Sequence, residues 1–167
     1  MHSDVRRFVP AEFEGPPARR PRNDPLDRGK SAALERLRQW TRSPRYRMKF
    51  TIFSCGVLFE RFARGGLASV GIGGSTGANY QGAYLMDIEH STAEIIERTT
   101  AGRPVYVSLI SANDVGRFVA AAITEIDLET WPSEFRMAAE RLSITQTLQY
   151  AESIKGGLYM HLNPRND

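Results

Sequence analysis

Hydrophobic positions in the first third of the chain fall into two short runs separated by a helical stripe. Val5 to Val9 is a strand-like run that stops at Pro10, because proline cannot donate a hydrogen bond to a neighbouring strand. A helix follows, with Asp27 as its N-cap and an apolar stripe that continues to Trp40. Phe50 to Phe53 is the second strand-like run. The order of strand, helix and strand predicts a βαβ unit whose two strands run parallel.

The rest of the chain alternates between further strand-like runs, helical stripes and loops. Strands are expected where β-branched and aromatic residues gather, at Tyr84–Ile88, Ala93–Ile96, Val105–Ile110 and Glu134–Met137. Helices are expected at Val57–Ala63, Ser111–Ile123 and Ser143–Lys155. Proline and glycine content predicts loops without regular structure at Gly15–Pro25 and Gly65–Gly82, and a frayed tail after Leu158.

Composition places the chain among ordinary globular proteins. It has 167 residues, of which 41% are hydrophobic and 25% charged, so it can bury a core without disulfides. The only cysteine is Cys55, which excludes an internal disulfide and favours a reducing compartment. No apolar run approaches the roughly 20 residues that cross a bilayer. We therefore expect a cytoplasmic protein without membrane contacts.

Positive charge is concentrated at the start of the chain. Residues 1–50 hold 13 of the 22 Lys and Arg but only 6 of the 19 Asp and Glu, so the remainder is acidic. This segment carries no RNA-recognition signature, zinc-finger spacing or arginine-glycine repeat. A solvated basic loop and helix face is favoured over nucleic-acid binding, which would show a steep dependence on salt.

Other motifs that could carry chemistry have ordinary structural explanations. Gly71 to Gly77 superficially resembles a dinucleotide-binding turn, but its flanks favour a Gly-rich loop over a phosphate cradle. Cys55 directly follows a strand, where nucleophiles occur, yet a lone cysteine is more often a small buried hydrophobic residue. His2, His90 and His161 are scattered without metal-ligand spacing, so the pattern gives no support for metal catalysis.

Lys30 is the residue for which we expect acid-base chemistry. With Asp27 as the N-cap it occupies the third helical position, near the positive end of the helix dipole. That field disfavours an ammonium group and, in a dry site, would ease proton exchange near neutral pH. The spacing alone leaves a solvated surface lysine open as the alternative.

Four segments resemble the NmrA-like and isoflavone-reductase-like proteins, an atypical group of short-chain dehydrogenases. Val5 to Phe13, with the sequence VRRFVPAEF, is similar to the family's R-F-x-P-S-E-F motif. Three further segments are similar in the same order: Thr51–Glu60, Ser111–Val119 and Trp131–Met137. The resemblance spans nearly the whole chain and is closest to fungal-type members.

The resemblance implies an α/β fold, made of the C-terminal part of a Rossmann-like parallel sheet and part of a smaller substrate-binding region. Residues 1–64 would be the second part of the NAD(P)-binding domain. Residues 65–167 would be a substrate-domain portion with interleaved Rossmann elements. The family's Gly-rich phosphate turn, which follows the first strand of such a domain, would precede Val5, so the chain is expected to be a fragment.

The resemblance also implies a site. It places Lys30 on the family's catalytic lysine, the general acid/base beside the nicotinamide of NADP(H) or NAD(H). Ligands of open α/β sheets bind beyond the carboxyl ends of the strands. The residues that follow two of the predicted strands are therefore expected to contact the cofactor: Pro10, Glu12, Phe13, Ser54, Cys55 and Gly56.

The function implied is an NAD(P)H-dependent reductase that acts on an aromatic or other secondary-metabolite substrate and is inactive if the cofactor half is missing. A regulatory module of the same family, which senses NAD(P) without turnover and contacts a protein partner or a second copy, is the alternative. Turnover of NADPH with a carbonyl or enone substrate separates the two.

Overall fold

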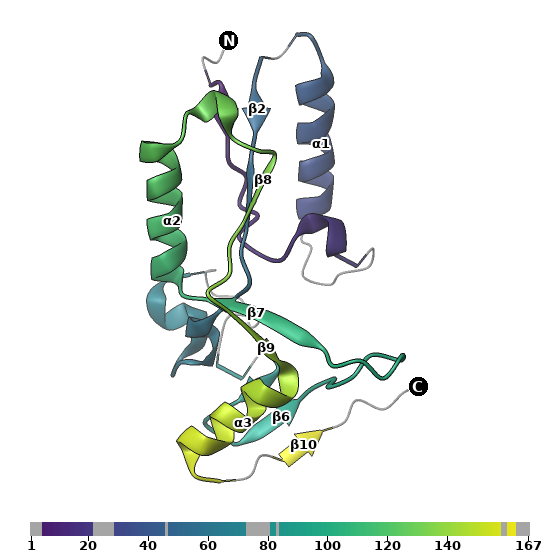
Figure 1. The fold of residues 1–167 in the computed structure, drawn as a ribbon, viewed down its shortest axis with the longest axis vertical. Coiled ribbons are helices and arrows are strands. Elements are labelled where there is room, and N and C mark those ends of the chain that lie inside the picture. Colours follow the sequence, from purple (N-terminus) through teal and green to yellow (C-terminus); the bar gives the residue numbers. More distant parts are fainter. Residues whose placement is uncertain are drawn as a thin grey trace. The chain divides into compact units, whose positions relative to one another are not determined.

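The chain folds as a mixed α/β protein with three α-helices and several small sheets in the residues that its structure describes (Figure 1). The computed structural model describes residues 5–21, 29–45, 47–72, 81–82, 84–157 and 160–162. It divides into two compact units, residues 1–56 with 113–137 and residues 57–112 with 138–167. Within the described ranges, no helix has the length and apolar character that crossing a bilayer requires.

The first unit is built on parallel strands. Strand β1 (Arg7–Phe8) pairs in parallel with β2 (Lys49–Phe50), and β3 (Ile52–Ser54) pairs in parallel with β8 (Glu134–Arg136). Residues 49–54 run between the other two strands: the Thr51 amide donates to the Phe8 carbonyl at 3.0 Å, and the Ile52 amide to the Ser133 carbonyl at 3.0 Å. The three strand segments therefore end at the same edge.

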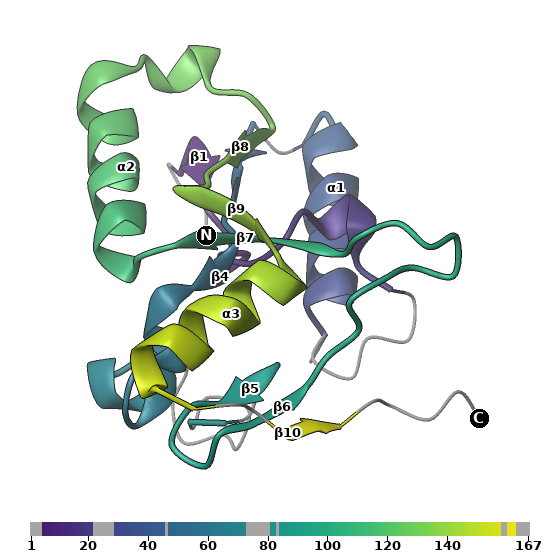
Figure 2. The ribbon, with the colours of Figure 1, turned by 60° about the horizontal axis from the view of Figure 1, so that its bottom comes forward.

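Two α-helices and two short 3-10 turns complete this unit. Helix α1 (Lys30–Arg42) buries Leu34 and Leu37, and helix α2 (Ala112–Glu125) buries Ala122. The strands run between these two helices in both Figure 1 and Figure 2. The 3-10 turns are Pro17–Arg19 and Leu128–Thr130.

Phe53 is the centre of the first unit's aromatic core. Its side chain is fully buried. It stacks on Phe13 with ring centroids 6.1 Å apart and on Phe135 at 5.1 Å. Phe118 of α2 and Trp131 meet it edge-on at 6.4 and 5.6 Å. A single strand residue thus joins the segment after β1, the helix α2 and the strand β8.

The second unit contains two mixed three-stranded sheets (Figure 2). In one, β7 (Tyr106–Ile110) lies between β4 (Val57–Leu58), which is parallel to it, and β9 (Glu140–Ser143), which is antiparallel. In the other, β6 (Thr92–Glu94) lies between β10 (Met160–Leu162), which is parallel, and β5 (Met86–Asp87), which is antiparallel. The unit also has 3-10 turns at Phe59–Phe62 and Gly66–Val70.

Helix α3 (Ile144–Lys155) supplies one side of the second unit's core. Ser143 and Gln146 form a reciprocal capping box at its start, and Gly156 ends it in the left-handed conformation with φ of 73°. Ile144, Leu148 and Ala151 of α3 are buried with residues from the strands. The strand residues of this cluster are Met86, Ala93, Ile95, Val107 and Leu109.

Most of the predicted elements are confirmed. The βαβ unit has parallel strands, and α2 and α3 lie where helices were predicted, with α3 ending at Gly156. Helix α1 begins at Lys30 after Gly29, whose φ is 82°. Lys30 is therefore the first residue of the helix and not the third, and the proposed N-cap Asp27 lies outside the described residues.

Four local predictions are wrong. The predicted helix at Val57–Ala63 is a strand followed by a 3-10 turn, because Val57 pairs with Leu109 of β7. The two predicted loops contain the 3-10 turns Pro17–Arg19 and Gly66–Val70. The predicted frayed tail contains β10, which pairs with β6. In addition, β9 was not predicted. Each strand among these depends on a partner far away in sequence.

Truncation of the Phe53 side chain should destabilise the first unit. Because its ring is fully buried and contacts four other aromatic rings, Phe53→Ala should lower the free energy of unfolding by about 3 to 5 kcal/mol. Urea denaturation followed by tryptophan fluorescence measures this loss. The matched control is Phe8→Ala, since Phe8 is 41% exposed and should cost clearly less. Equal losses for the two variants would contradict Phe53 as the centre of the core.

Candidate functional site

Three segments of the first unit gather polar and charged side chains beyond the carboxyl ends of its parallel strands. They are the residues after β1, the first turn of α1 and the residues after β3. Lys30 at the start of α1 lies against Glu14, with the ammonium nitrogen 2.5 Å from Oε1. The structure therefore brings the predicted catalytic lysine to the segment that follows β1, and gives it a counter-charge that the sequence did not reveal.

A buried ion pair lies beside this contact. Arg20 donates to the carboxylate of Glu12, and the two side chains are only 6% and 3% exposed. The same guanidinium lies 3.9 Å from Oε2 of Glu14 and donates to the Ser31 hydroxyl at 3.4 Å. Glu12, Arg20, Glu14 and Lys30 thus form a continuous series of contacts, called here the ion-pair chain.

Cys55 lies within the electrostatic reach of this chain. Its thiol is 2% exposed, and burial raises its pKa from the ordinary value of 9.0 to about 11. Glu14 pushes the pKa of the thiol up and Lys30 pulls it down, which are smaller effects than that of burial. At neutral pH the thiol is therefore protonated, as expected for a buried hydrophobic residue and not for an activated nucleophile.

The other residues predicted to contact the cofactor differ in their exposure and in their hydrogen bonds. The Pro10 carbonyl accepts a hydrogen bond from the Glu12 amide at 2.8 Å, which makes a tight turn directly after β1. Phe13 follows this turn and keeps 38% of its surface exposed although it stacks on Phe53. Gly56 is partly buried at the end of β3. Phe13 thus presents an aromatic surface near the ion-pair chain.

Ser54 is committed to a different group of side chains. It is 2% exposed, and its hydroxyl donates to Glu134 of β8 at 2.6 Å. Arg136 contacts the other oxygen of Glu134 at 2.9 Å. This guanidinium, with a smaller contribution from Ser54, holds the pKa of Glu134 below its usual value although burial opposes it. The Ser54 hydroxyl is therefore occupied within the protein.

Sequence reasoning missed Glu14 and Arg20. Glu14 lies 16 residues before its partner Lys30, and Arg20 lies eight residues after Glu12. Glu12, Glu14 and Arg20 lie outside the helices and strands, so no periodicity indicates which of them meet. The remaining signal is the density of charge around the prolines, which does not indicate which residues pair.

The structure describes only part of the other motifs. Residues 73–80 of the Gly-rich stretch lie outside the described residues. His90 pairs with Asp87 at 2.8 Å, and this hydrogen bond raises the pKa of the imidazole. Among the described residues, no group of three or more His, Cys, Asp or Glu could hold a metal ion.

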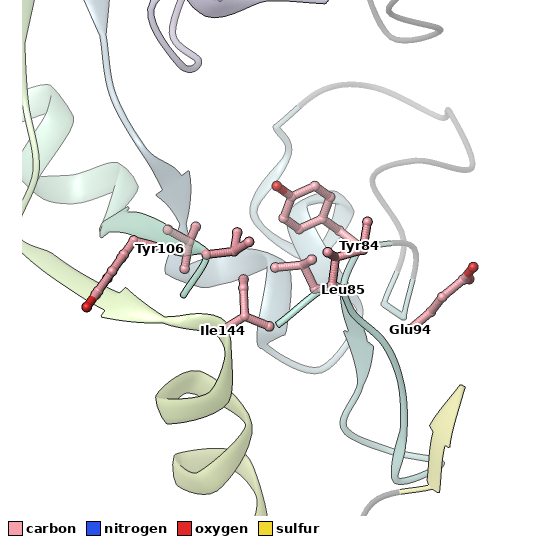
Figure 3. Close-up of a pocket in the computed structure, with 8 residues that line it drawn as sticks. Tyr84, Leu85, Glu94, Tyr106 and Ile144 are labelled. Carbon is pink, nitrogen blue, oxygen red and sulfur yellow. The ribbon is translucent and has the colours of Figure 1, made fainter. Parts of the chain in front are cut away.

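The second unit contains an apolar cavity of about 510 Å³ (Figure 3). Figure 3 shows Leu85 and Ile144 at its centre, while the carboxylate of Glu94 and the hydroxyl of Tyr106 point away from them. Burial raises the pKa of Tyr84, which keeps this phenol neutral, and Arg61 lies over its ring at 5.3 Å. The cavity has the size of a small-molecule site. None of the predicted catalytic or cofactor-binding residues lines it.

No protein-family model matches the chain, and no curated protein matches it.

The Cys55 thiol should resist alkylation in the native protein. A pKa of about 11 leaves about 100-fold less thiolate at pH 8 than the ordinary value of 9.0, and burial restricts access further. Labelling with iodoacetamide should therefore be at least about 100-fold slower in the folded chain than in urea. The native rate should also keep increasing between pH 10 and 11, where the unfolded thiol, with its ordinary pKa of 9.0, is already mostly ionised. Similar rates for the native and unfolded chains would contradict this environment.

Proposed function

We propose that this protein is an NAD(P)H-dependent reductase of the NmrA-like and isoflavone-reductase-like type, acting on an aromatic or other secondary-metabolite substrate. The observation that carries the proposal is the position of Lys30. Its amine is held beyond the carboxyl ends of parallel strands, where open α/β sheets bind their ligands. The sequence resemblance assigns the same residue to proton transfer.

The parallel strands of the first unit and the two helices beside them are compatible with part of a Rossmann-like domain. In this proposal β1, the segment 49–54 and β8 are neighbouring strands of the cofactor-binding sheet. The second unit supplies the substrate-binding region. Its pocket of about 510 Å³, with a mainly apolar lining, is large enough for an aromatic substrate.

The charges at the strand edge indicate which part of a dinucleotide, the nicotinamide or the pyrophosphate, these residues could contact. A pyrophosphate requires unpaired cations or free amides, but here Arg20 and Lys30 contact the carboxylates of Glu12 and Glu14. An uncharged ring tolerates these carboxylates and can contact the exposed face of Phe13. These residues therefore fit the nicotinamide end, and we assign no phosphate contact to them.

Within this proposal the protein and the cofactor divide the chemistry. The bound nicotinamide supplies the hydride. Lys30 moves the accompanying proton at its Nζ atom, and Glu14 keeps that atom at the strand edge. Phe13 and the buried residues around Phe53 limit the access of water from the side of the core.

Replacement of Lys30 by methionine is the direct test of this proposal. Lys30→Met keeps most of the side-chain volume and removes the ionisable group. Single-turnover hydride transfer from NADPH should fall by about 100-fold to 10,000-fold, while NADPH affinity stays near normal. Calorimetry measures the affinity.

The matched control is Lys49→Met, because Lys49 also forms an ion pair, with Glu129, but its side chain is 57% exposed in the same unit. It should transfer hydride at the normal rate. An unchanged rate in Lys30→Met would remove Lys30 from the mechanism. NADPH binding without turnover of any carbonyl or enone substrate would instead favour the regulatory, NAD(P)-sensing function.

A further inference from the structure

Helix α1 does not by itself hold the side chain of Lys30 in one position. It is the first residue of α1, and the N-cap Gly29 provides no side-chain hydrogen bond to the helix. A lysine has a flexible four-carbon stem and three equivalent donors, so its ammonium group needs an external partner to hold one position. The side chain is 28% exposed, which leaves it free to move into solvent without such a partner.

Glu14 provides that partner, and its two oxygens are divided between two cations. Oε1 contacts the Lys30 ammonium at 2.5 Å. Oε2 lies 3.9 Å from the Arg20 guanidinium. A carboxylate that contacts a cation on each side has fewer accessible rotamers than one with a single partner. Glu14 is therefore held in the orientation that reaches Lys30.

The buried Glu12–Arg20 pair anchors the other end of the ion-pair chain. Both side chains are almost completely buried, and a guanidinium removed from water in this way must keep its carboxylate partner. Arg20 also reaches Ser31, the second residue of α1, at 3.4 Å. The arginine thus connects the segment after β1 to the first turn of the helix that carries Lys30.

We propose that Glu14 is the positioning residue for Lys30, and that Arg20, fixed by its buried pair with Glu12, sets the orientation of Glu14. The ion-pair chain holds the lysine amine at the carboxyl ends of the strands, facing the place where a substrate would react. Only the catalytic consequence rests on the proposed function. The contact between Glu14 and Lys30 can be tested by measurements that do not depend on enzymatic activity.

Cys55 supports the position assigned to both charges. The pKa of its thiol is raised by Glu14 and lowered by Lys30, so both side chains lie close enough to influence the residue that follows β3. Two opposite charges that act on one buried group belong to one local cluster. A lysine that extended into solvent would not contribute to it.

Competitive acetylation of lysines tests the contact directly. The chain has three lysines, Lys30, Lys49 and Lys155, so peptide mass spectrometry reports each rate separately. Because the contact with Glu14 restricts access to the Lys30 amine, Glu14→Gln should speed acetylation of Lys30 about 2-fold to 5-fold, with the other two rates unchanged. Glu14→Asp, which keeps the charge, should return the Lys30 rate toward that of the wild type.

Glu35→Gln is the matched control, because Glu35 is an exposed glutamate of the same helix that pairs with Arg38. It should leave the Lys30 rate unchanged. Glu14 is 45% exposed, so Glu14→Gln should retain its fold, which circular dichroism checks. A Lys30 rate equal to that of the wild type in folded Glu14→Gln would overturn the proposal.

Activity then separates this proposal from the proposed function. If Lys30 transfers the proton, Glu14→Gln should lower kcat about 10-fold or more with little change in KM, and Glu14→Asp should recover part of the loss. Faster acetylation without a change in kcat would overturn positioning for catalysis. Full activity of Lys30→Met would overturn the proposed function, whereas the acetylation rates would still decide whether Glu14 holds Lys30.

Discussion

The hydrogen bonding of residues 49–54 on both sides is the constraint on which the first unit depends. This segment bonds to β1 through its first half and to β8 through its second half, so neither edge can move without breaking the pairing. Thr51, Ile52, Phe53 and Ser54 are all buried as a result. The polar pair among them is satisfied, since Thr51 donates to the Pro132 carbonyl and Ser54 to Glu134. Few substitutions here could preserve both the packing and the hydrogen bonds.

The position of the candidate site follows from this pairing. Strands that run in parallel end at one edge, so the chain that leaves β1 and the chain that leaves β3 emerge side by side. Helix α1 returns its first residue, Lys30, to the segment after β1. The sheet thus supplies the location, and the ion-pair chain supplies the orientation. Lys30 can therefore be held in place by Glu14 although helix α1 has no side-chain cap at its start.

Charge balance gives the site its chemical character. The ion-pair chain has two carboxylates and two cations, so the formal charges of these four side chains balance. The edge is therefore better suited to an uncharged ring and a proton-transfer step than to a phosphate. The second unit differs because its pocket has a mainly apolar lining, and the carboxylate of Glu94 and the hydroxyl of Tyr106 point away from Leu85 and Ile144 in Figure 3.

The sequence by itself determined the class of fold and most of the helices, because their hydrophobic periodicity and end signals are local. Gly156 and the apolar stripe of α3 are examples, and the run that stops at Pro10 predicted the place where β1 ends. It also indicated Lys30, Glu12 and Cys55 as residues of one region. Only the tertiary structure decided that Val57 is in a strand, that β10 pairs with β6, and that Lys30 contacts Glu14. These features depend on partners that are distant in sequence. Burial and pairing in the folded protein provide the free energy that selects those partners. A local sequence pattern does not indicate which distant residues will pair.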